Sequence, residues 1–263
     1  MTVFCPLASG SKGNALFLKT REGNILIDAG LSARALSERL GQIGEHLDSI
    51  RAIIITHEHH DHICGLKVLA LKIGIPVIAN YATAEKIVES IGDCPQFHIF
   101  TTHEPFEFLG MHIHPFTTPH DGVDPVGITI QTDNRKIGIC TDLGFVPPSV
   151  KHHLMGCHLI CLEANHHPDM VHASSRPDIY KRRVLSKTGH LSNLEAAQLL
   201  ALVAHPHLKQ VYLAHLSEEC NTEEKAIQTV QEFLQKGGTR VNIDIARQNT
   251  VSNPYVLNER DVS

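Results

Sequence analysis

Residues 57–62, with the sequence His-Glu-His-His-Asp-His, constrain this chain more than any other segment. They follow the run Ala-Ile-Ile-Ile-Thr at 52–56, which is typical of a buried strand. The segment would therefore leave the end of a sheet, where loops carry binding groups on a rigid support. Imidazole and carboxylate groups at this density favour a site for zinc, manganese or iron over one for calcium. The alternative is a polar turn with chance histidines, since the chain has 20 of them in 263 residues.

The order His-x-His-x-Asp-His after Thr56, followed by Gly65, resembles the signature of the metallo-β-lactamase-fold hydrolases. This resemblance implies an αββα four-layer sandwich with the metals at one edge between two sheets. It also implies further ligands, each of which has a counterpart in order along the chain. The implied ligands are His57, His59 and His120 for one ion, Asp61, His62 and His215 for the second, and Asp142 as a bridge between them.

The cofactors implied by the resemblance are two divalent metal ions, which can be zinc, manganese or iron. Such ions, about 3.5 to 4 Å apart, share a bridging hydroxide that serves as nucleophile and neutralise charge on the substrate oxygens. The positive charge of two divalent ions exceeds the negative charge of the ligand carboxylates and the hydroxide. The site would therefore favour an anionic substrate, above all a phosphodiester. The resemblance therefore predicts a metal-dependent phosphodiesterase with Asp61 and Asp142 among its catalytic residues.

Two residues near the implied ligands are expected to have supporting roles. Asp28 ends the expected strand at 24–28 and would accept hydrogen bonds from the ligand loop, thereby orienting its histidines. Ordinary turn chemistry at a strand end is the alternative. Cys140 lies two residues before Asp142, on the same side of a strand, and a thiolate ligand there would favour an antibiotic-hydrolysing β-lactamase. Because Asp142 suits the bridging role better, we expect Cys140 to be a small core residue.

Length and composition favour one domain spanning residues 1–263. With 42% hydrophobic residues, the chain can bury a large core without disulfides. It has neither a signal-peptide pattern nor a run near the about 18 apolar residues that span a bilayer, so we expect a soluble cytoplasmic protein with no membrane partner. The seven cysteines are scattered without a CxxC pair, which favours reduced thiols. The sequence does not indicate an oligomeric state.

Apolar runs alternate with helix-like segments along the whole chain. Strands are expected near 3–8, 14–19, 24–28, 52–55, 76–79, 105–109, 111–117, 126–132, 136–141, 157–162, 210–214 and 240–245. Helices are expected near 32–42, 63–73, 82–91, 192–204 and 222–236. Ser32 and Ser192 can act as N-caps, and the acidic residues after Thr222 favour a helix start.

Longer motifs resemble one group within these hydrolases. They are residues 9–14 (Ser-Gly-Ser-Lys-Gly-Asn), 163–166 (Glu-Ala-Asn-His), 181–184 (Lys-Arg-Arg-Val), 189–193 (Gly-His-Leu-Ser-Asn) and 215–221 (His-Leu-Ser-Glu-Glu-Cys-Asn). Together they look like the YycJ/WalJ group of bacterial proteins. This resemblance implies a 5′-to-3′ exonuclease whose nucleic acid substrate is single-stranded or 5′-ended DNA.

Residues 162–165 and 189–192 also resemble two short motifs of tRNA 3′-processing enzymes, in which a Glu positions a His near the scissile phosphate. On this resemblance His190 would protonate the leaving oxygen or bind the phosphate. Glu163 would hold His190 in its useful tautomer and raise its pKa. The alternative for His190 is a helix-entry residue that caps Ser192 and Asn193.

Candidate substrate contacts lie in the same motifs, namely Ser11, Lys12, Asn14, Asn165, Arg182, Arg183 and Asn193. Loop 9–14 can offer backbone N–H groups to a terminal phosphate, with Lys12 as a point charge, but a tight turn between strands needs the same glycines. The basic stretch around Arg182 can guide a nucleic-acid backbone, or it is a solvated helix face. The net charge of −5 weighs against a large non-specific nucleic-acid surface but allows a narrow positive cleft.

Three functions of different kinds remain open at this point. A two-metal nuclease on DNA is favoured. A hydrolase of small phosphodiesters or thioesters on the same scaffold, or an RNA-processing nuclease, is the second candidate. A metal-binding regulatory or redox protein is the third, and it is disfavoured because His59 and Asp61 keep the hydrolase pattern rather than that of diiron oxygen reductases. Similarity of fold alone does not choose among them.

Overall fold

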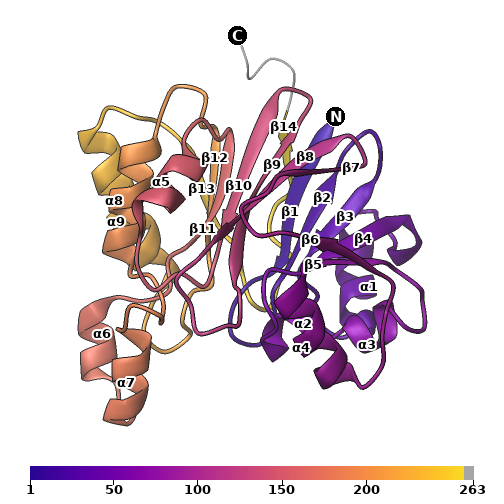
Figure 1. Cartoon of the computed structure of the whole chain (residues 1–263). Coiled ribbons are helices and arrows are strands. Elements are labelled where there is room, and N and C mark those ends of the chain that lie inside the picture. The colour runs from indigo at the N-terminus through magenta and orange to yellow at the C-terminus, as the bar shows by residue number, and fades with distance from the viewer. Residues whose placement is uncertain (258–263) are drawn as a thin grey trace.

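The computed structural model describes residues 1–257, so residues 258–263 of the expected single domain lie outside the described part. Two sheets of seven strands pack face to face in the described chain (Figure 1). The first sheet has the order β14-β1-β2-β3-β4-β5-β6, with β1 (Thr2–Ala8), β2 (Ala15–Lys19), β3 (Asn24–Ile27), β4 (Ile50–Ile54), β5 (Val77–Asn80), β6 (Phe97–Phe100) and β14 (Tyr255–Leu257). The second has the order β13-β12-β11-β10-β9-β8-β7, with β7 (Phe106–Phe108), β8 (Met111–Thr117), β9 (Val126–Thr132), β10 (Arg135–Cys140), β11 (Leu159–Glu163), β12 (Gln210–Ala214) and β13 (Asn242–Ile245).

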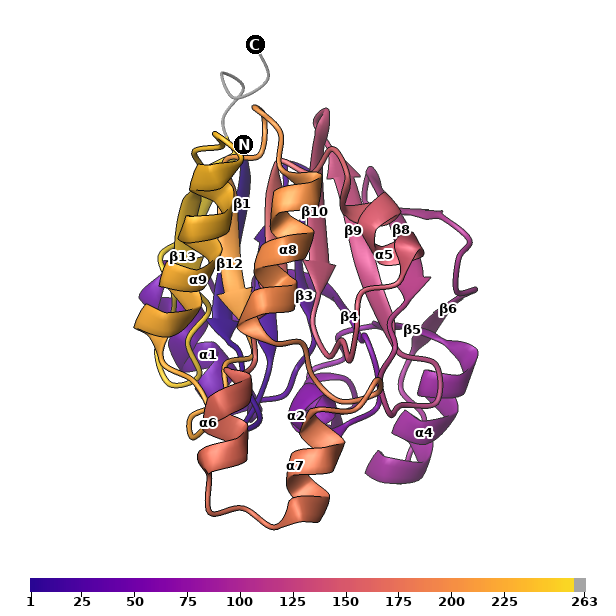
Figure 2. The ribbon, with the colours of Figure 1, turned by 90° about the vertical axis from the view of Figure 1, so that its left-hand side faces the viewer.

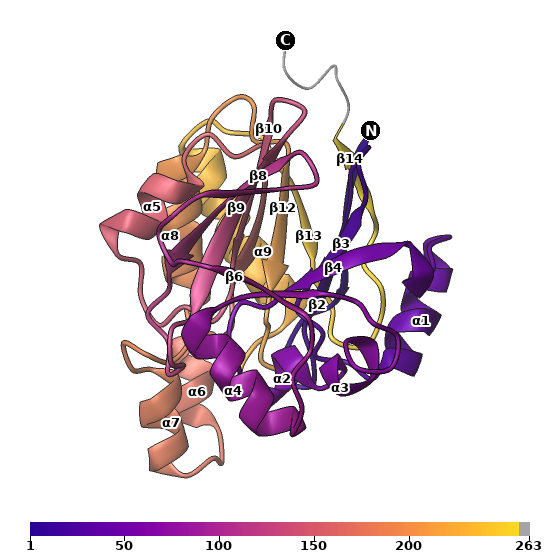
Figure 3. The same ribbon diagram turned by 45° about the vertical axis from the view of Figure 1, so that its right-hand side comes forward.

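Helices cover the outer face of each sheet, which confirms the expected αββα sandwich (Figures 1 and 3). The first sheet carries α1 (Ala33–Gln42), α3 (Leu66–Leu69) and α4 (Tyr81–Ile91), and the second carries α5 (Pro148–Leu154), α8 (Asn193–Val203) and α9 (Glu223–Lys236). The shorter segments are η1 (Leu47–Ser49), α2 (His60–Ile63), α6 (Pro168–Ala173) and α7 (Asp178–Val184). Figure 2 shows α6 and α7 at the opposite end of the molecule from the N-terminus.

The strand sequences place apolar side chains on both faces of each sheet. In β3, Ile25 and Ile27 pack between the sheets, whereas Leu26 faces the helices, as the period of two requires. Across the interface, the rings of Phe4 and Tyr212 lie 5.7 Å apart. Because both faces are covered, central strands such as β3 and β11 are nearly continuous apolar runs, whereas β8, nearer a sheet edge, has exposed or partly exposed polar residues among its buried ones.

Helix starts predicted from single residues are confirmed. The Ser32 side chain accepts a hydrogen bond from Ala35 N at 3.2 Å. Ser192 forms a capping box with Glu195, and Thr222 caps the helix that begins with Glu223. These contacts satisfy N–H groups that have no partner within the helix itself.

The helix expected over 63–73 is wrong in its extent, because the structure has two short helices, α2 and α3, in this region. Asp61 O accepts a hydrogen bond from Asn14 N, and Gly65 N donates to Ala29 O, both at 2.8 Å. The backbone bond that would continue α2 is therefore replaced by contacts to neighbouring loops.

Six elements were not predicted, namely η1, β6, α5, α6, α7 and β14. Pro148 and Pro168 occupy the first helical positions of α5 and α6, where proline is favourable although it breaks a helix elsewhere. Strands β6 and β14 are edge strands of three or four residues, too short for a period-two pattern.

The cysteines have the expected state. All seven lie within the described residues and are free thiols. Cys140 packs among Leu143 and Leu162 in the cluster beneath α8, and burial raises the pKa of its thiol well above the usual value. This placement fits a core residue. None of the described helices is long and apolar enough to cross a bilayer.

Candidate metal centre

Strand ends deliver polar residues to one edge of the sandwich. Asp28 directly follows β3 and His57 follows β4, while Asp142 follows β10 and His215 follows β12. Strands β3 and β4 pair in parallel, as do β10, β11 and β12. The carboxyl ends of parallel strands meet at one edge of a sheet, which is where α/β proteins form their sites.

Three of these residues turn the backbone into the left-handed region. The φ angles are 62° at Asp28, 54° at Asp142 and 55° at His215. Residues other than glycine rarely adopt this conformation, and each such position costs about 1–3 kcal/mol unless its surroundings hold it. Its recurrence at three strand ends that meet in one place points to a functional site.

His57, His59 and His120 form the first group of candidate ligands, because one ligand atom of each lies within 4.8 Å of the others. His57 Nε2 lies 3.1 Å from His59 Nδ1. Burial, together with nearby His62, lowers the pKa of His57 well below its usual value, and burial lowers the pKa of His120. Neutral imidazole is the form that binds a metal, so this group is suited to one ion.

Asp61, His62, Asp142 and His215 form the second set. His62 Nε2 lies 3.2 Å from Asp142 Oδ2 and 3.5 Å from Asp61 Oδ2. His215 Nε2 lies 3.8 Å from Asp61 Oδ2. Asp142 also reaches the first group, since its Oδ1 lies 3.6 Å from His120 Nε2. Asp142 thus lies between the two groups, where the resemblance implied a bridging carboxylate.

The carboxylates make this edge strongly attractive to positive charge. Although burial favours the neutral acid, His215 and His62 lower the pKa of Asp142 well below its usual value. Burial alone would lower the pKa of His215, but Asp142 and Glu163 raise it to about 9. Cations bound here would displace protons from such imidazoles, which couples metal binding to pH.

Oxygen acceptors hold the Nδ1 atom of three of the histidines. The pairs are His62 Nδ1 and Asp28 Oδ2 at 2.8 Å, His120 Nδ1 and Gly189 O at 3.1 Å, and His215 Nδ1 and Glu163 Oε1 at 3.1 Å. Each contact favours a proton on Nδ1 and leaves the Nε2 lone pair for a metal. Asp28 also accepts from Thr56 N at 2.9 Å, so it links one strand end to the ligand loop.

Two buried atoms test whether this cluster suits a metal. Asp142 Oδ2 and His215 Nε2 are buried and make no hydrogen bond of good geometry within residues 1–257, although His62 Nε2 lies 3.2 Å from Asp142 Oδ2. Buried polar atoms without a partner are costly, and a cation between them would remove that cost. Imidazole and carboxylate donors in this proportion suit a divalent transition metal. The residues therefore fit a divalent metal.

Loop 9–14 packs directly against the ligand loop. Asn14 Nδ2 lies 3.1 Å from Asp61 Oδ2. A Cβ atom at Gly30 would lie 1.6 Å from Asp61 O, so only glycine allows this approach. The structure thus places Asn14 against the candidate ligand Asp61.

Glu163 and His190 form a close pair beside the second set. His190 Nδ1 lies 2.7 Å from Glu163 Oε1, and Glu163 Oε2 accepts a hydrogen bond from Leu143 N at 2.7 Å. Burial opposes ionisation of Glu163, but His190 and His215 lower its pKa to about 2. The fully buried carboxylate thus fixes the orientation of His190, whose side chain remains 20% exposed.

A cavity of about 300 Å³ opens next to this cluster. It is lined by Ser11, Lys12, Asn165, Arg176, Tyr180, Arg183, Val184, His190, His215, Leu216, Ser217, Glu218 and Glu219. Its three cations are each paired with a carboxylate, because Lys12 contacts Glu218, Arg176 contacts Glu219 and Arg183 contacts Asp121. We call this cavity the cationic pocket.

Four of the predicted substrate contacts line the cationic pocket, namely Ser11, Lys12, Asn165 and Arg183. Asn14, Asn193 and Arg182 do not. Asn193 is buried and donates to Asn221 Oδ1 at 2.8 Å, which holds the loop before α9. Arg182 is exposed on α7 outside the lining.

The backbone of loop 9–14 is mostly bonded within the protein. Gly10 N donates to Asn14 Oδ1, Lys12 N to Gln248 Oε1, and Gly13 N to Gly10 O. Gly10 and Gly13 have φ angles of 145° and 147°. The tight-turn alternative therefore describes these glycines, which corrects the expectation that several N–H groups face a phosphate.

Sequence reasoning missed Asp121, Tyr180, Glu218 and Glu219. Asp121 Oδ1 lies 3.2 Å from His120 Nε2, and its Oδ2 lies 2.8 Å from Arg183 Nη2. Asp121 thus links the first ligand group to α7. The signal for Asp121 was its position directly after His120, and the two glutamates lie in the motif at 215–221, whereas no sequence pattern pointed to Tyr180.

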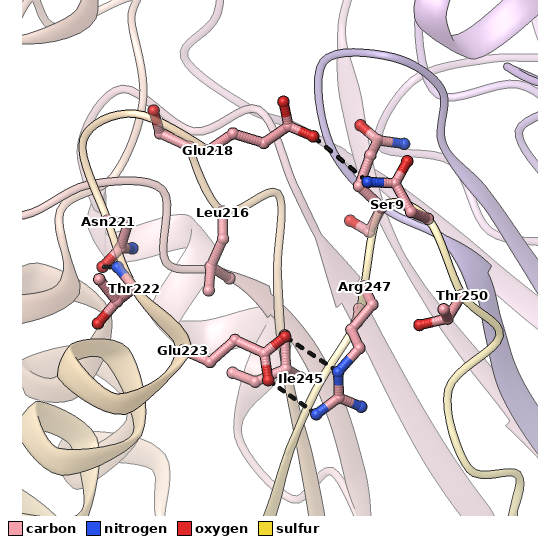
Figure 4. Close-up of a pocket in the computed structure, with 13 residues that line it drawn as sticks. Ser9, Leu216, Glu218, Asn221, Thr222, Glu223, Ile245, Arg247 and Thr250 are labelled. Carbon is pink, nitrogen blue, oxygen red and sulfur yellow. Dashed lines mark hydrogen bonds and ion pairs between the residues drawn. The ribbon is translucent and has the colours of Figure 1, made fainter.

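A second cavity of about 260 Å³ adjoins the cationic pocket, and Leu216 and Glu218 line both. Figure 4 shows Glu223 and Arg247 facing each other in this cavity, joined by an ion pair at 2.8 Å. This pairing fixes the segment that follows β13. The second cavity contains none of the candidate metal ligands.

Comparisons with known proteins agree with this geometry. The sequence model described as the metallo-beta-lactamase superfamily matches residues 8–210. The exodeoxyribonuclease YycJ of Bacillus anthracis is 37% identical over 237 residues, which covers 89% of this chain and 90% of the relative. The exodeoxyribonuclease WalJ of Streptococcus pneumoniae is 35% identical over 242 residues, or 90% of each chain.

A solved structure shows the same fold. The metallo-beta-lactamase fold protein YhfI of Bacillus subtilis superposes with a TM-score of 0.70 at 15% identity, covering 95% of this chain and 98% of that one. At this identity the likeness concerns the fold alone. The sequence matches, in contrast, span nearly all of the chain. The chain therefore belongs to the metallo-beta-lactamase superfamily and, within it, to the family of the YycJ and WalJ proteins.

Proposed function

We propose that the protein is a binuclear metal-dependent phosphodiesterase that acts as a 5′-to-3′ exonuclease on DNA. The observation that carries the proposal is the cationic pocket, which opens directly beside the clustered metal ligands. The relatives named exodeoxyribonucleases, which match about nine-tenths of the chain, support the same activity. A cytoplasmic location fits this function and stays a prediction.

The ligand geometry supports two ions. His57, His59 and His120 would hold one, Asp61, His62 and His215 would hold the other, and Asp142 would contact both. Zinc, manganese and iron all suit these donors. When bound, such ions supply an activated water and neutralise charge on the phosphate oxygens.

His190 has the geometry of a proton donor or phosphate contact. Glu163 holds its Nδ1 atom, and no hydrogen bond within residues 1–257 engages Nε2. Because His190 lines the cationic pocket, its Nε2 can meet a phosphodiester placed there. Glu163 acts through His190 and His215, as a residue that orients both imidazoles.

The pocket suits the end of a nucleic acid strand. Lys12, Arg176 and Arg183 line the pocket, and each is paired with a carboxylate, so a phosphate bound there would compete with Glu218, Glu219 and Asp121 for their N–H groups. A cavity of about 300 Å³ is at the small end of ligand pockets, which favours one nucleotide over a duplex. We therefore propose single-stranded or 5′-ended DNA as the substrate.

A time course with single-stranded DNA tests the proposal. The strand carries a 5′-phosphate and a 3′ label, manganese or zinc is added, and His59→Ala serves as the control. We expect stepwise shortening of the labelled strand with release of mononucleotides, and no shortening by His59→Ala. Immediate release of the label as a mononucleotide would reverse the polarity. If DNA and RNA both stay intact, the substrate class is wrong, and small phosphodiesters and thioesters become the candidates.

A further inference from the structure

One wall of the cationic pocket comes from the segment that holds α6 and α7. Arg176, Tyr180 and Arg183 lie on this wall, and His190 and His215 lie in the same cavity. Apart from the histidines, Tyr180 is the aromatic residue among the residues that line it. The wall thus brings an arginine and an aromatic ring beside the metal cluster.

Arg176 is held by two contacts at once. Its Nε donates to Glu219 Oε2 at 2.7 Å, and its Nη2 contacts Glu219 Oε1. Its guanidinium carbon lies 5.3 Å from the centroid of the Tyr180 ring. Because Glu219 occupies one edge of the guanidinium, that edge is closed to a phosphate, while the side chain as a whole remains 48% exposed.

A small apolar cluster supports this arrangement. Val171 of α6, Val184 of α7 and Cys220 are buried together, and Tyr180 packs against them. Lys181 Nζ donates to His172 O at 2.8 Å, which joins α7 to α6. The ring beneath Arg176 is therefore fixed by packing that is separate from the main core.

We propose that Arg176 and Tyr180 form a stacking platform for the terminal base of the bound DNA strand. The proposal rests on the proposed function and names the part of the substrate that this wall recognises. Bases stack on guanidinium planes and on aromatic rings without regard to their identity. Such a platform would place the terminal nucleotide so that its phosphodiester reaches His190 and the metal cluster.

The alternative is that Arg176 acts only as a positive charge toward phosphate. Lysine would then serve as well as arginine, since both carry one charge, whereas only arginine offers a plane. Arg176→Lys therefore separates the two roles. Arg34, which is exposed on α1 and pairs with Glu38 at 2.9 Å, provides a matched arginine–glutamate pair outside the pocket.

The experiment compares 5′-phosphorylated strands that have either a normal or an abasic terminal nucleotide. The quantity measured is the ratio of kcat/KM for the normal strand to that for the abasic strand, with manganese present. We expect Arg176→Lys and Tyr180→Ala to lower this ratio by about 5-fold or more, because stacking of one base typically contributes about 5- to 150-fold. Tyr180→Phe and Arg34→Ala should keep the wild-type ratio.

Binding provides a readout that does not depend on cleavage. A terminal 2-aminopurine on a cleavage-resistant phosphorothioate strand should lose fluorescence when it binds the wild type, and less so with Arg176→Lys. The platform is overturned if the wild-type protein cleaves normal and abasic strands equally well. It is also overturned if Arg176→Lys keeps both the kcat/KM ratio and the quenching of the wild type. If the wild type cleaves no DNA, the proposed function fails, and the quenching alone decides the platform. If Tyr180→Ala does not fold, Arg176→Lys alone tests the stacking platform.

Discussion

Histidines in the cluster of candidate metal ligands are oriented by contacts to one ring nitrogen. The Nδ1 atoms of His62 and His215 face the carboxylates of Asp28 and Glu163. The candidate ligands could be named from the sequence because their order and spacing after strands are distinctive, and the structure brings them together. Their orientation could not, since it depends on acceptors such as Gly189 O that meet His120 only in the fold.

His190→Ala tests the role of the Glu163–His190 pair. We expect kcat on single-stranded DNA to fall by about 10²- to 10⁴-fold, the usual contribution of a general acid or base. The metal content should stay that of the wild type, because the proposed ligands are unchanged. Measured metal per chain is the control, and a loss of metal would show that His190 is a ligand.

His153 gives a prediction at a residue outside the cluster of candidate metal ligands. Its ring stacks on Phe116 with centroids 4.5 Å apart, and burial, with nearby His114 and His152, lowers its pKa from 6.5 to about 4. The unfolded chain then binds the proton more readily, so the stability contributed by neutral His153 is complete above pH 6.5 and is lost as pH falls toward 4.

His153→Leu should therefore weaken the acid dependence of the melting temperature. The variant should lose less stability than the wild type between pH 6.5 and 4, as measured by calorimetry in one buffer series. Parallel pH profiles for the two proteins would contradict this explanation.

At the scale of elements, helix α7 connects the candidate metal ligands with the wall of the cationic pocket. Arg183 binds Asp121, which lies beside His120, and Tyr180 lies one turn earlier on the same helix. The sequence predicted α8 and α9 because their caps and apolar faces follow local rules. It did not predict α6 and α7, which are short and pack on the segment that contains Cys220.

Arg183→Ala and Arg182→Ala separate the two basic positions of α7. Removing one phosphate contact should reduce the slope of log K against log salt by about 0.7 for single-stranded DNA. We expect this change for Arg183→Ala, whose side chain lines the cationic pocket, and a smaller one for Arg182→Ala. Equal slopes in fluorescence-anisotropy titrations of both variants would reject a pocket contact by Arg183.

In the whole molecule, the candidate ligands come from both halves of the sandwich. His57, Asp61 and His62 follow β4 of the first sheet, whereas Asp142 and His215 follow strands of the second. The two-sheet fold could be predicted from the order of motifs, as could the edge at which the candidate metal ligands gather. The cationic pocket could not, because residues distant in sequence pair across it, as Lys12 does with Glu218.

Removal of metal should destabilise the whole molecule, because bound ions would tie the two sheets together. A ligand at 100 times its Kd stabilises a protein by about 2.7 kcal/mol, which corresponds to about 5–10 °C in Tm for a chain of this size. We expect chelation to lower Tm by that amount in calorimetry. His59→Ala should show a smaller decrease, since it already lacks one ligand. An unchanged Tm in the wild type would indicate that no metal links the sheets.

A titration of metal into the chelator-treated protein tests the central claim most directly. Bound manganese or zinc per chain and the rate of DNA shortening are measured on the same samples. The account predicts that activity is absent without metal and becomes maximal as two ions bind per chain. Full activity without metal, or binding of two ions with no cleavage of DNA, would contradict it.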